Sequence, residues 1–374
     1  MDFEFLKKLS LPSFPNFLLG GRRSFVGIDI GFSSVKVVQL RKESERAILE
    51  TYGELRTAPY LKNVDGSGIG SGFLRFRDSD IIEMLVDILR EANVTANQAV
   101  FAVPSISSFI TMVELPTGDR DEVARAVPFE ARRYIPIPIS EVSLDWQIID
   151  EGDAAETGAL AKTKAILVAV PKDVIGKFER VAKGANLTLA GLEIETFSLV
   201  RSLLANDKTI TALINYGSQS STVTVVDRRV VMLSHNIDRG SNELTSALAR
   251  GLNITLERAE AFKTEIGISE RPEDREVASV MSPLIELLFS EIDRILGSYN
   301  RKTERRIERV VVTGGGSRIK GLIDYTAKRF GLETIQINPF SRVTYPAFMQ
   351  PILKDIGPSF ATAVGLALRN ITPK

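Results

Sequence analysis

Two apolar runs separated by a short polar turn begin the patterned part of the chain. The run "FVGIDIGFSSVKVVQL" (residues 25–40) has the composition of two buried strands joined by a turn of glycine and serines. The run "ALINYGSQSSTVTVV" (residues 212–226) repeats this design, with Gly217 in the place of Gly31. Because the two turns lie almost half the chain apart, the pattern predicts two structurally equivalent halves, each opening with a β-hairpin.

Strands and helices alternate in the rest of the chain. The spacing of apolar residues predicts helices at residues 78–94 and 282–302. The run "VVVTGGGSRIKGL" (residues 310–322) predicts a strand, a glycine turn and a helix. Two stretches of glycine or small polar residues, 63–79 and 151–163, are predicted to be loops. The alternation predicts an α/β chain with helices packed on sheets.

The composition limits the chemistry that the chain can perform. It contains no cysteine, which excludes disulfides, thiol catalysis and zinc–thiolate sites, and its single histidine argues against imidazole catalysis. Acidic and basic residues number 47 each, so no net charge attracts nucleic acid or anionic lipid. Carboxylates, hydroxyls, backbone amides and a bound metal remain as the means for any chemistry.

Residues 1–24 form an apolar extension before the first predicted strand. Its acidic start and its two prolines argue against a signal peptide. No stretch of the chain has the roughly 20 apolar residues that a membrane-spanning helix needs, so we expect a cytoplasmic protein. The extension is either a short amphipathic element that docks on a partner or a membrane surface, or a segment folded against the body of the protein.

Three glycine turns are the candidate ligand sites. Backbone N–H groups and serine hydroxyls converge in such turns and bind phosphate oxygens, and successive glycines let a planar ligand approach the backbone closely. Asp29, at the end of the first strand, is placed to hold a hydrated magnesium ion. Lys36 on the returning strand either points back toward the phosphates or faces solvent. The candidate residues of the turns are Gly31, Phe32, Ser33 and Ser34; Asn215, Gly217, Ser218, Gln219, Ser220 and Gly240; and Gly314, Gly315, Gly316, Ser317 and Ile319.

The order of these turns resembles that of the actin-like ATPase superfamily. The resemblance implies an α/β fold of two duplicated domains flanking a nucleotide cleft, with ATP or ADP and Mg²⁺ as ligands. Glu260 and Lys263 lie on one face of the predicted helix "LERAEAFKTE", where family members contact the nucleoside, and their alternative reading is a plain surface pair. The run "SFATAVGLALR" resembles the closing helix of the fold.

The segment inserted into the first domain resembles the PilM family, an FtsA-like branch of this superfamily in type IV pilus assembly. The resemblance rests on "EARRYIP" (residues 130–136) and "LDWQII" (residues 144–149), and it covers about residues 24–370. The division that it implies is an N-terminal extension at 1–24, subdomain 1A at 25–106 and 187–208, an inserted subdomain 1C at 107–186, subdomain 2A at 209–245 and 309–374 including the closing helix, and subdomain 2B at 246–308.

The family implies a cytoplasmic ATP-binding scaffold at the inner face of the cytoplasmic membrane. Its partner would be the N-terminal peptide of a PilN-like single-pass membrane protein, bound between subdomains 1A and 1C. Tyr134, Ile135 and Pro136 belong either to that groove or to the insertion's own core. The resemblance also allows contacts with pilus motor or platform proteins and self-association, and nothing in it points to nucleic acid.

The second turn departs from the pattern of active ATPases. Asn215 stands where those enzymes carry an aspartate, and Gly240 is what remains of a usual glycine pair. An asparagine can accept a bond from metal-bound water but cannot act as a base, so we expect at most slow hydrolysis and no catalytic residue is assigned. The alternatives are an FtsA-like filament-forming membrane tether and, less favoured, a small-molecule kinase of the same fold.

Overall fold

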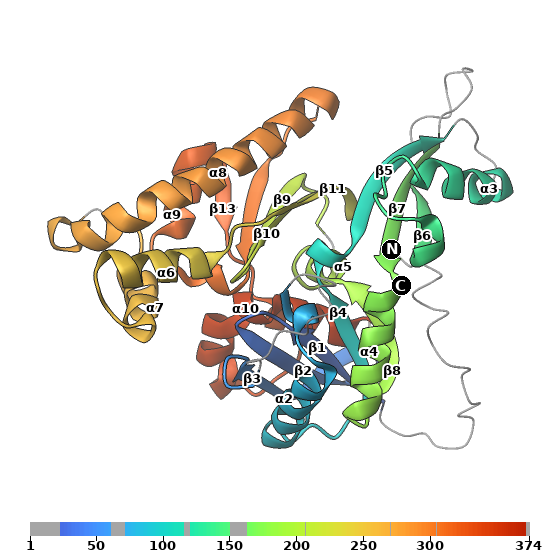
Figure 1. Cartoon of the computed structure of the whole chain (residues 1–374), viewed down its shortest axis with the longest axis horizontal. Helices are drawn as coiled ribbons and strands as arrows, with labels where there is room; N and C mark the ends of the chain where they lie inside the picture. The colour runs from blue at the N-terminus through green and yellow to red at the C-terminus, as the bar shows by residue number, and fades with distance from the viewer. Residues whose placement is uncertain are drawn as a thin grey trace. The chain divides into compact units, whose positions relative to one another are not determined.

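The two predicted hairpins lie at the centres of two sheets built on one plan (Figure 1). The computed structural model describes residues 23–60, 72–115, 120–149, 163–205, 207–269, 271–303 and 305–371. One sheet has the strand order β3-β2-β1-β4-β8 and the other β11-β10-β9-β12-β13, each with three antiparallel strands followed by two parallel ones. The strands are β1 (Ser24–Ile30), β2 (Ser34–Glu43), β3 (Arg46–Arg56), β4 (Gln98–Val103) and β8 (Thr188–Ile194), then β9 (Thr211–Tyr216), β10 (Ser221–Asp227), β11 (Val230–Ile237), β12 (Arg309–Thr313) and β13 (Glu333–Ile335). The predicted internal duplication is therefore confirmed.

The chain divides into two compact units, each with one of these sheets. Unit 1 contains the residues up to Arg201 and those from Thr362 onward, and unit 2 is Ser202–Ala361. The helix α10 (Gln350–Leu368) contributes residues to both units. The predicted N-terminal extension falls almost entirely outside the described residues, as do residues 63–71 and 151–162 of the predicted loops. The finer division into subdomains stays a prediction.

Unit 1 carries a second, smaller sheet within the predicted insertion. Its strand order is β5-β7-β6, and the apolar residues of α3 pack on it to form a separate core. The helices α2 and α4 pack against each other beside the larger sheet. The bounds are β5 (Phe109–Leu115), α3 (Arg120–Ala131), β6 (Val142–Ile149), β7 (Thr163–Pro171), α2 (Asp78–Glu91), α4 (Lys172–Gly184) and α5 (Glu195–Leu203), with short 3₁₀ turns η1 (Gly72–Arg75) and η2 (Ser105–Ser107).

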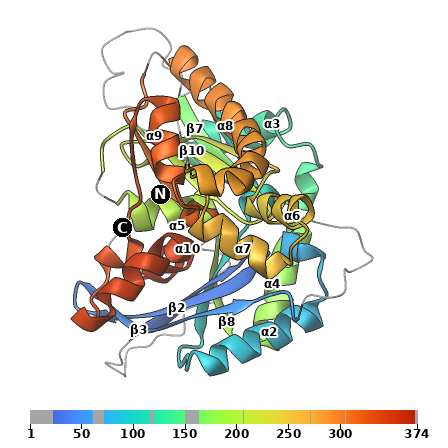
Figure 2. The ribbon, with the colours of Figure 1, turned by 90° about the vertical axis from the view of Figure 1, so that its left-hand side faces the viewer.

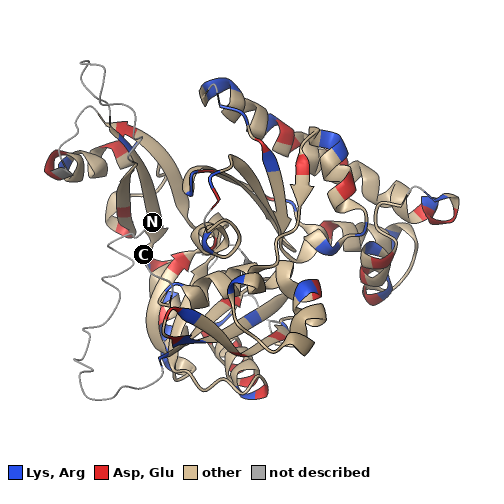
Figure 3. Cartoon of the chain, turned by 180° about the vertical axis from the view of Figure 1, so that it is seen from behind, with Lys and Arg blue, Asp and Glu red and all other residues tan. Residues whose placement is uncertain are grey.

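Unit 2 is built around the long helix α8 (Arg275–Thr303), seen in orange in Figures 1 and 2. The predicted apolar stripe of this helix, which includes Ile285, Ile292 and Leu296, is buried in the core of the unit. Basic and acidic residues alternate along this helix, as Figure 3 shows, so it carries no long run of one charge. The other helices of the unit are α6 (Ser241–Gly251), α7 (Leu256–Glu265) and α9 (Leu322–Phe330).

The last helix packs on the first strand without intervening side chains. A Cβ atom on Gly27 of β1 would lie 2.2 Å from the carbonyl oxygen of Ala363 in α10. No side chain fits at this distance, so glycine is required for the approach. Residues from the two ends of the chain thereby share one core in unit 1.

Candidate functional site

The first glycine turn is held closed by its own backbone. The N–H of Gly31 donates to the carbonyl oxygen of Ser34 at 3.0 Å, and a Cβ atom on Gly31 would lie 2.9 Å from that oxygen. Thr57, at the end of β3, supports the turn from beside it, since its backbone N–H donates to the carbonyl oxygen of Ser33 and its hydroxyl to that of Phe32. The turn is therefore preformed.

A charged row crosses the three antiparallel strands of unit 1 next to this turn. Asp29 on β1 pairs in register with Lys36 on β2, and Lys36 pairs with Glu54 on β3. The Lys36 ammonium donates to the hydroxyl of Ser34 at 2.6 Å and lies 3.3 Å from Glu54. Because Lys36 is buried, its solvent-facing alternative is excluded.

Two carboxylates of unit 1 influence each other. Burial raises the pKa of Asp29, an effect that the positive charge of Lys36 opposes and the negative charge of Glu54 reinforces. Burial also raises the pKa of Glu195 to about 8, and the charge of Asp29 adds to the rise, while a backbone N–H bond from Ser105 opposes it. Like-charged carboxylates held near one another favour the protonated form of one of them.

Glu195 is a candidate site residue that the sequence reasoning missed. It is the first residue of α5 and directly follows β8, which lies parallel to β4 in the sheet. Side chains at the carboxyl ends of parallel strands face the usual ligand side of an α/β sheet. An acidic residue directly after the buried strand "LAGLEI" was the available signal.

The second glycine turn, in unit 2, repeats the first and packs on the start of α6. The N–H of Gly217 donates to the carbonyl oxygen of Ser220 at 3.1 Å. The backbone N–H groups of Ser241 and Asn242 donate to the carbonyl oxygens of Gly217 and Ser218, at 3.0 and 2.9 Å. A Cβ atom on Gly240, which precedes α6, would lie 2.3 Å from the Ser218 oxygen. Gly240 therefore lies against the second turn, with which the sequence pattern grouped it.

The row across unit 2 is neutral where that of unit 1 is charged. Asn215 on β9 pairs in register with Thr222 on β10, and Thr222 pairs with Asn236 on β11. The Thr222 hydroxyl donates to the side-chain oxygen of Asn236 at 2.9 Å. The position equivalent to Lys36 therefore carries a hydroxyl, a second neutral position beside Asn215 that the sequence pattern alone did not reveal.

The third glycine turn lies directly against the second. Gly314 has φ = 88°, and a Cβ atom on it would lie 2.5 Å from the side-chain oxygen of Asn215. A Cβ atom on Gly316 would lie 2.8 Å from the ring of Tyr216, whereas one on Gly315 would enter open space. Only glycine allows this backbone conformation and contact. Unit 2 thus brings the second and third predicted turns together.

Two predicted residues of the third turn have packing roles. Ile319 lies in the hydrophobic core of unit 2. The buried hydroxyl of Ser317 donates to the carbonyl oxygen of Gly314 at 2.6 Å and so closes the turn from within. Both residues were predicted to bind ligand because they follow the glycines in sequence, but neither exposes a group to a ligand.

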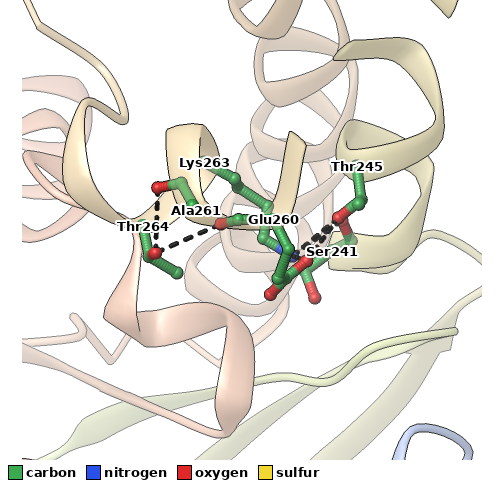
Figure 4. A network of polar contacts seen from close by, with 6 residues as sticks. All are labelled: Ser241, Thr245, Glu260, Ala261, Lys263 and Thr264. Carbon is green, nitrogen blue, oxygen red and sulfur yellow. Dashed lines mark hydrogen bonds and ion pairs between the residues drawn. The ribbon is translucent and has the colours of Figure 1, made fainter. Parts of the chain in front are cut away.

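Glu260 and Lys263 form the centre of a polar network between α6 and α7 (Figure 4). The Lys263 ammonium lies 2.6 Å from Glu260 and donates to the hydroxyl of Thr245 at 2.9 Å, and that hydroxyl bonds to Glu260 at 2.7 Å. Lys263 is only 2% exposed, so the pair is not a plain surface pair. Burial lowers the pKa of Lys263, and its ion pair with Glu260 opposes that shift. Because Lys263 also reaches the backbone oxygen of Ser241, the network joins the second turn.

The predicted partner segment divides between core and surface. Ile135 is buried in the core of the small sheet, whereas Tyr134 and Pro136 are exposed. Phe129 on α3 is 66% exposed, and the guanidinium of Arg132 lies over its ring at 5.4 Å. Exposed aromatic and arginine side chains are the residues that dominate binding at protein interfaces.

Neither a metal cluster nor a membrane span is found in the described part of the chain. Among those residues, no group of three or more histidine, aspartate or glutamate side chains is arranged to hold a metal ion. None of the helices formed by them combines the length and the hydropathy needed to cross a bilayer.

Comparison with known proteins identifies the family. Residues 27–371 match the family described as type IV pilus assembly protein PilM. The chain belongs to the PilM family. Among solved structures, a PilM-PilN type IV pilus biogenesis complex matches with a TM-score of 0.80 and 22% identity, over 94% of this chain and 100% of that one. The ethanolamine utilization protein EutJ of Carboxydothermus hydrogenoformans matches with a TM-score of 0.54 and 16% identity, over 98% and 96% of the two chains.

The curated relatives are cell division proteins. FtsA of Enterococcus hirae is 20% identical over 351 residues, which are 82% of this chain and 76% of that protein. FtsA of Agrobacterium fabrum is 25% identical over 228 residues, 54% of this chain and 50% of that protein. The predicted actin-like fold and its FtsA-like branch are confirmed by these matches.

Proposed function

We propose that this protein is a nucleotide-binding scaffold of type IV pilus assembly that docks the cytoplasmic N-terminal peptide of a PilN-like membrane protein. The observation that carries the proposal is the family match over nearly the whole chain. The similar solved structure described as a PilM-PilN complex supports the choice of partner. Through that partner the scaffold would sit at the inner face of the cytoplasmic membrane.

We propose a magnesium nucleotide as the ligand of the three turns. Glycine turns commonly bind phosphate oxygens through backbone N–H groups, and Lys36 supplies a buried positive charge beside the first turn. Asp29 would hold hydrated Mg²⁺, and Glu260 with Lys263 would face the nucleoside. An MreB of Spiroplasma citri bound to AMPPNP has a similar fold, with a TM-score of 0.51 and 12% identity. We therefore propose ATP or ADP with Mg²⁺ as the ligand.

Little or no hydrolysis is expected from this arrangement. In unit 2 the row that begins with Asn215 carries no charge, so it offers neither a base nor a carboxylate to orient a water molecule. In unit 1 the pKa of Glu195 is raised to about 8, which keeps this carboxyl protonated at neutral pH when no cation is bound. Nucleotide would serve as a structural or switching ligand rather than as a substrate.

The small sheet and α3 are the proposed partner-binding region. Phe129, Tyr134 and Pro136 expose apolar surface there, whereas Ile135 holds the segment in place from the core. We propose that the inserted subdomain spans residues 107–186 and that the peptide binds between it and subdomain 1A. The FtsA-like membrane tether is not favoured, because the family match is to PilM rather than to FtsA. The small-molecule kinase is less favoured still, because the family match is to a pilus assembly protein.

A peptide titration tests the proposal. Trp146, the only tryptophan of the chain, lies against the core of the small sheet, so its fluorescence reports on the insertion. A synthetic N-terminal peptide of a PilN-like protein should change this fluorescence with a saturable dependence. Phe129→Ser combined with Tyr134→Ser should weaken binding at least about tenfold, whereas Leu287→Ser on the exposed face of α8 should not. Absence of saturable binding, with or without MgATP, would exclude the peptide as partner.

A further inference from the structure

A single buried carboxylate holds two arginines at the edge of the larger sheet of unit 1. The side chain of Glu193, on β8, is 5% exposed. Both of its oxygens accept from the guanidinium of Arg201, at 2.5 and 2.6 Å, and the Nε of Arg369 lies 3.9 Å away. Removing one partner from a buried pair of this kind leaves an uncompensated charge, which destabilises the fold.

The two arginines mark the places where the chain leaves and re-enters unit 1. Arg201 is the last residue of unit 1 before the chain passes into unit 2 at Ser202. The chain returns to unit 1 at Thr362 within α10, and Arg369 follows the end of that helix. Both connections between the units are thus tied to Glu193.

Further contacts join the two connecting helices to each other. Arg201 also donates to the carbonyl oxygen of Gly365 on α10 at 2.9 Å. A Cβ atom on Gly365 would lie 2.0 Å from the carbonyl oxygen of Ser198 on α5, so the two helices meet backbone to backbone. The missing side chain of Gly191 leaves the space that Arg369 fills, since a Cβ atom there would lie 1.9 Å from its guanidinium. The ends of α5 and α10 are fixed as one block.

We propose that Glu193 is an ionic lock that fixes both connections to unit 1 and so confines movement between the units to the residues just outside it, near Ser202 and Ala361. The chain crosses between the units inside two helices, between Arg201 and Ser202 in α5 and between Ala361 and Thr362 in α10. Fixing the unit 1 side of both helices to one block leaves bending at these two crossings as the movement between the units. The lock therefore sets how widely the orientation of the units varies. It requires neither bound nucleotide nor a partner, so it stands apart from the proposed function.

The absence of cysteine from the chain allows a direct measurement. Cysteines introduced at Glu83, exposed on α2 of unit 1, and at Ser279, exposed on α8 of unit 2, can carry two spin labels. Pulsed electron resonance then gives the distribution of distances between the units in the full-length protein. Glu193→Gln should at least double the width of this distribution, and Arg201→Lys, which keeps the charge but loses the fork, should broaden it less.

A matched carboxylate separates the lock from ordinary stabilisation. Asp78 at the start of α2 also has two cationic partners, with Lys177 at 3.1 Å and Arg180 at 2.7 Å, but it lies far from both connections in sequence. Asp78→Asn should lower the melting temperature without widening the distribution. Equal widths for the Glu193, Arg201 and Asp78 variants would overturn the proposal.

Hydrogen exchange gives a second readout that does not depend on the labels. Amides of residues 196–203 and 362–371 should exchange at least about tenfold faster in Arg201→Lys than in Asp78→Asn, because releasing the fork frees both helix ends. If Glu193→Gln fails to fold, the Arg201→Lys variant decides the question by both measurements. Unchanged exchange in these two segments together with an unchanged distance distribution would show that Glu193 serves only local stability.

Discussion

Asp29 in unit 1 and Asn215 in unit 2 occupy the same place in two equivalent sheets. Each lies at the end of its hairpin's first strand, and each pairs with the second strand at the equivalent position, Asp29 with Lys36 and Asn215 with Thr222. The two sheets share one backbone arrangement, but only the row in unit 1 carries charged side chains. The two turns are therefore expected to contribute unequally to ligand binding, with unit 1 supplying the charged groups.

Removing the carboxylate of unit 1 should weaken magnesium-dependent nucleotide binding. Asp29→Asn keeps the shape of the side chain but loses the charge that attracts the hydrated cation. We expect the affinity for MgATP, measured by calorimetry, to fall about tenfold, or about 1.4 kcal/mol. Binding in chelator should change little, and the control Asp78→Asn should bind as the unaltered protein does. Unchanged MgATP affinity in Asp29→Asn would contradict the role given to the first turn.

Restoring an acid in unit 2 should raise hydrolysis. Asn215→Asp is isosteric, so it fits beside Gly314 while adding a carboxylate able to orient water. Phosphate release under single-turnover conditions should become faster. Asn236→Asp, which adds the same charge at the far end of the same row, is the matched control and should leave the rate low. An equal rate in both variants would show that hydrolysis is limited elsewhere. Thr222, which occupies the position equivalent to Lys36, would then be the next residue to alter.

Stability should fall with rising pH because of Glu195. Its pKa is raised to about 8 in the folded protein from an ordinary value of 4.5, so the folded state binds its proton more tightly than the unfolded state does. The resulting stabilisation is complete below pH 4.5 and disappears as the pH rises through about 8. Glu195→Gln removes this dependence. With chelator present, the melting temperature of the unaltered protein should therefore fall relative to that of the variant as the pH rises from 5 to 8. A constant difference between the two melting temperatures over this range would rule the effect out.

Deleting residues 1–22 should leave the fold and nucleotide binding intact, because β1 begins at Ser24 and every assigned turn follows it. The extension's many large apolar side chains are each worth roughly 1.5–3 kcal/mol when fully buried, so they are expected to cover some surface. A lower melting temperature with unchanged binding of partner peptide and lipid vesicles would indicate packing on the protein itself. Unchanged stability with weaker binding would indicate a docking element. Loss of ATP binding would contradict both readings.

The hairpins and their glycines could be predicted because strand period and turn chemistry are local properties of the sequence. The surroundings of Lys36 could not, since Glu54 reaches it only through the pairing of β2 with β3. Glu195 escaped notice for the same reason: the charge of Asp29 that helps raise its pKa comes from a strand far away in sequence. Tyr134 and Ile135 are adjacent in sequence and could not be assigned to surface or core from the pattern. The packing of Ile135 against α3 and the small sheet buries it, whereas Tyr134 stays exposed.

The division of unit 1 between the two ends of the chain has a consequence for its synthesis. On a ribosome the sheet of unit 1 emerges before unit 2, but the residues from Thr362 onward, which pack on Gly27 and supply the second arginine of Glu193, are made only after unit 2. Unit 2, which is continuous from Ser202 to Ala361, has all its residues available before then. Unit 2 is therefore able to complete its folding first, and unit 1 waits for the residues from Thr362 onward with the side of its sheet that α10 covers still exposed. A nascent chain stalled just before Thr362 should consequently be a favoured substrate for chaperones.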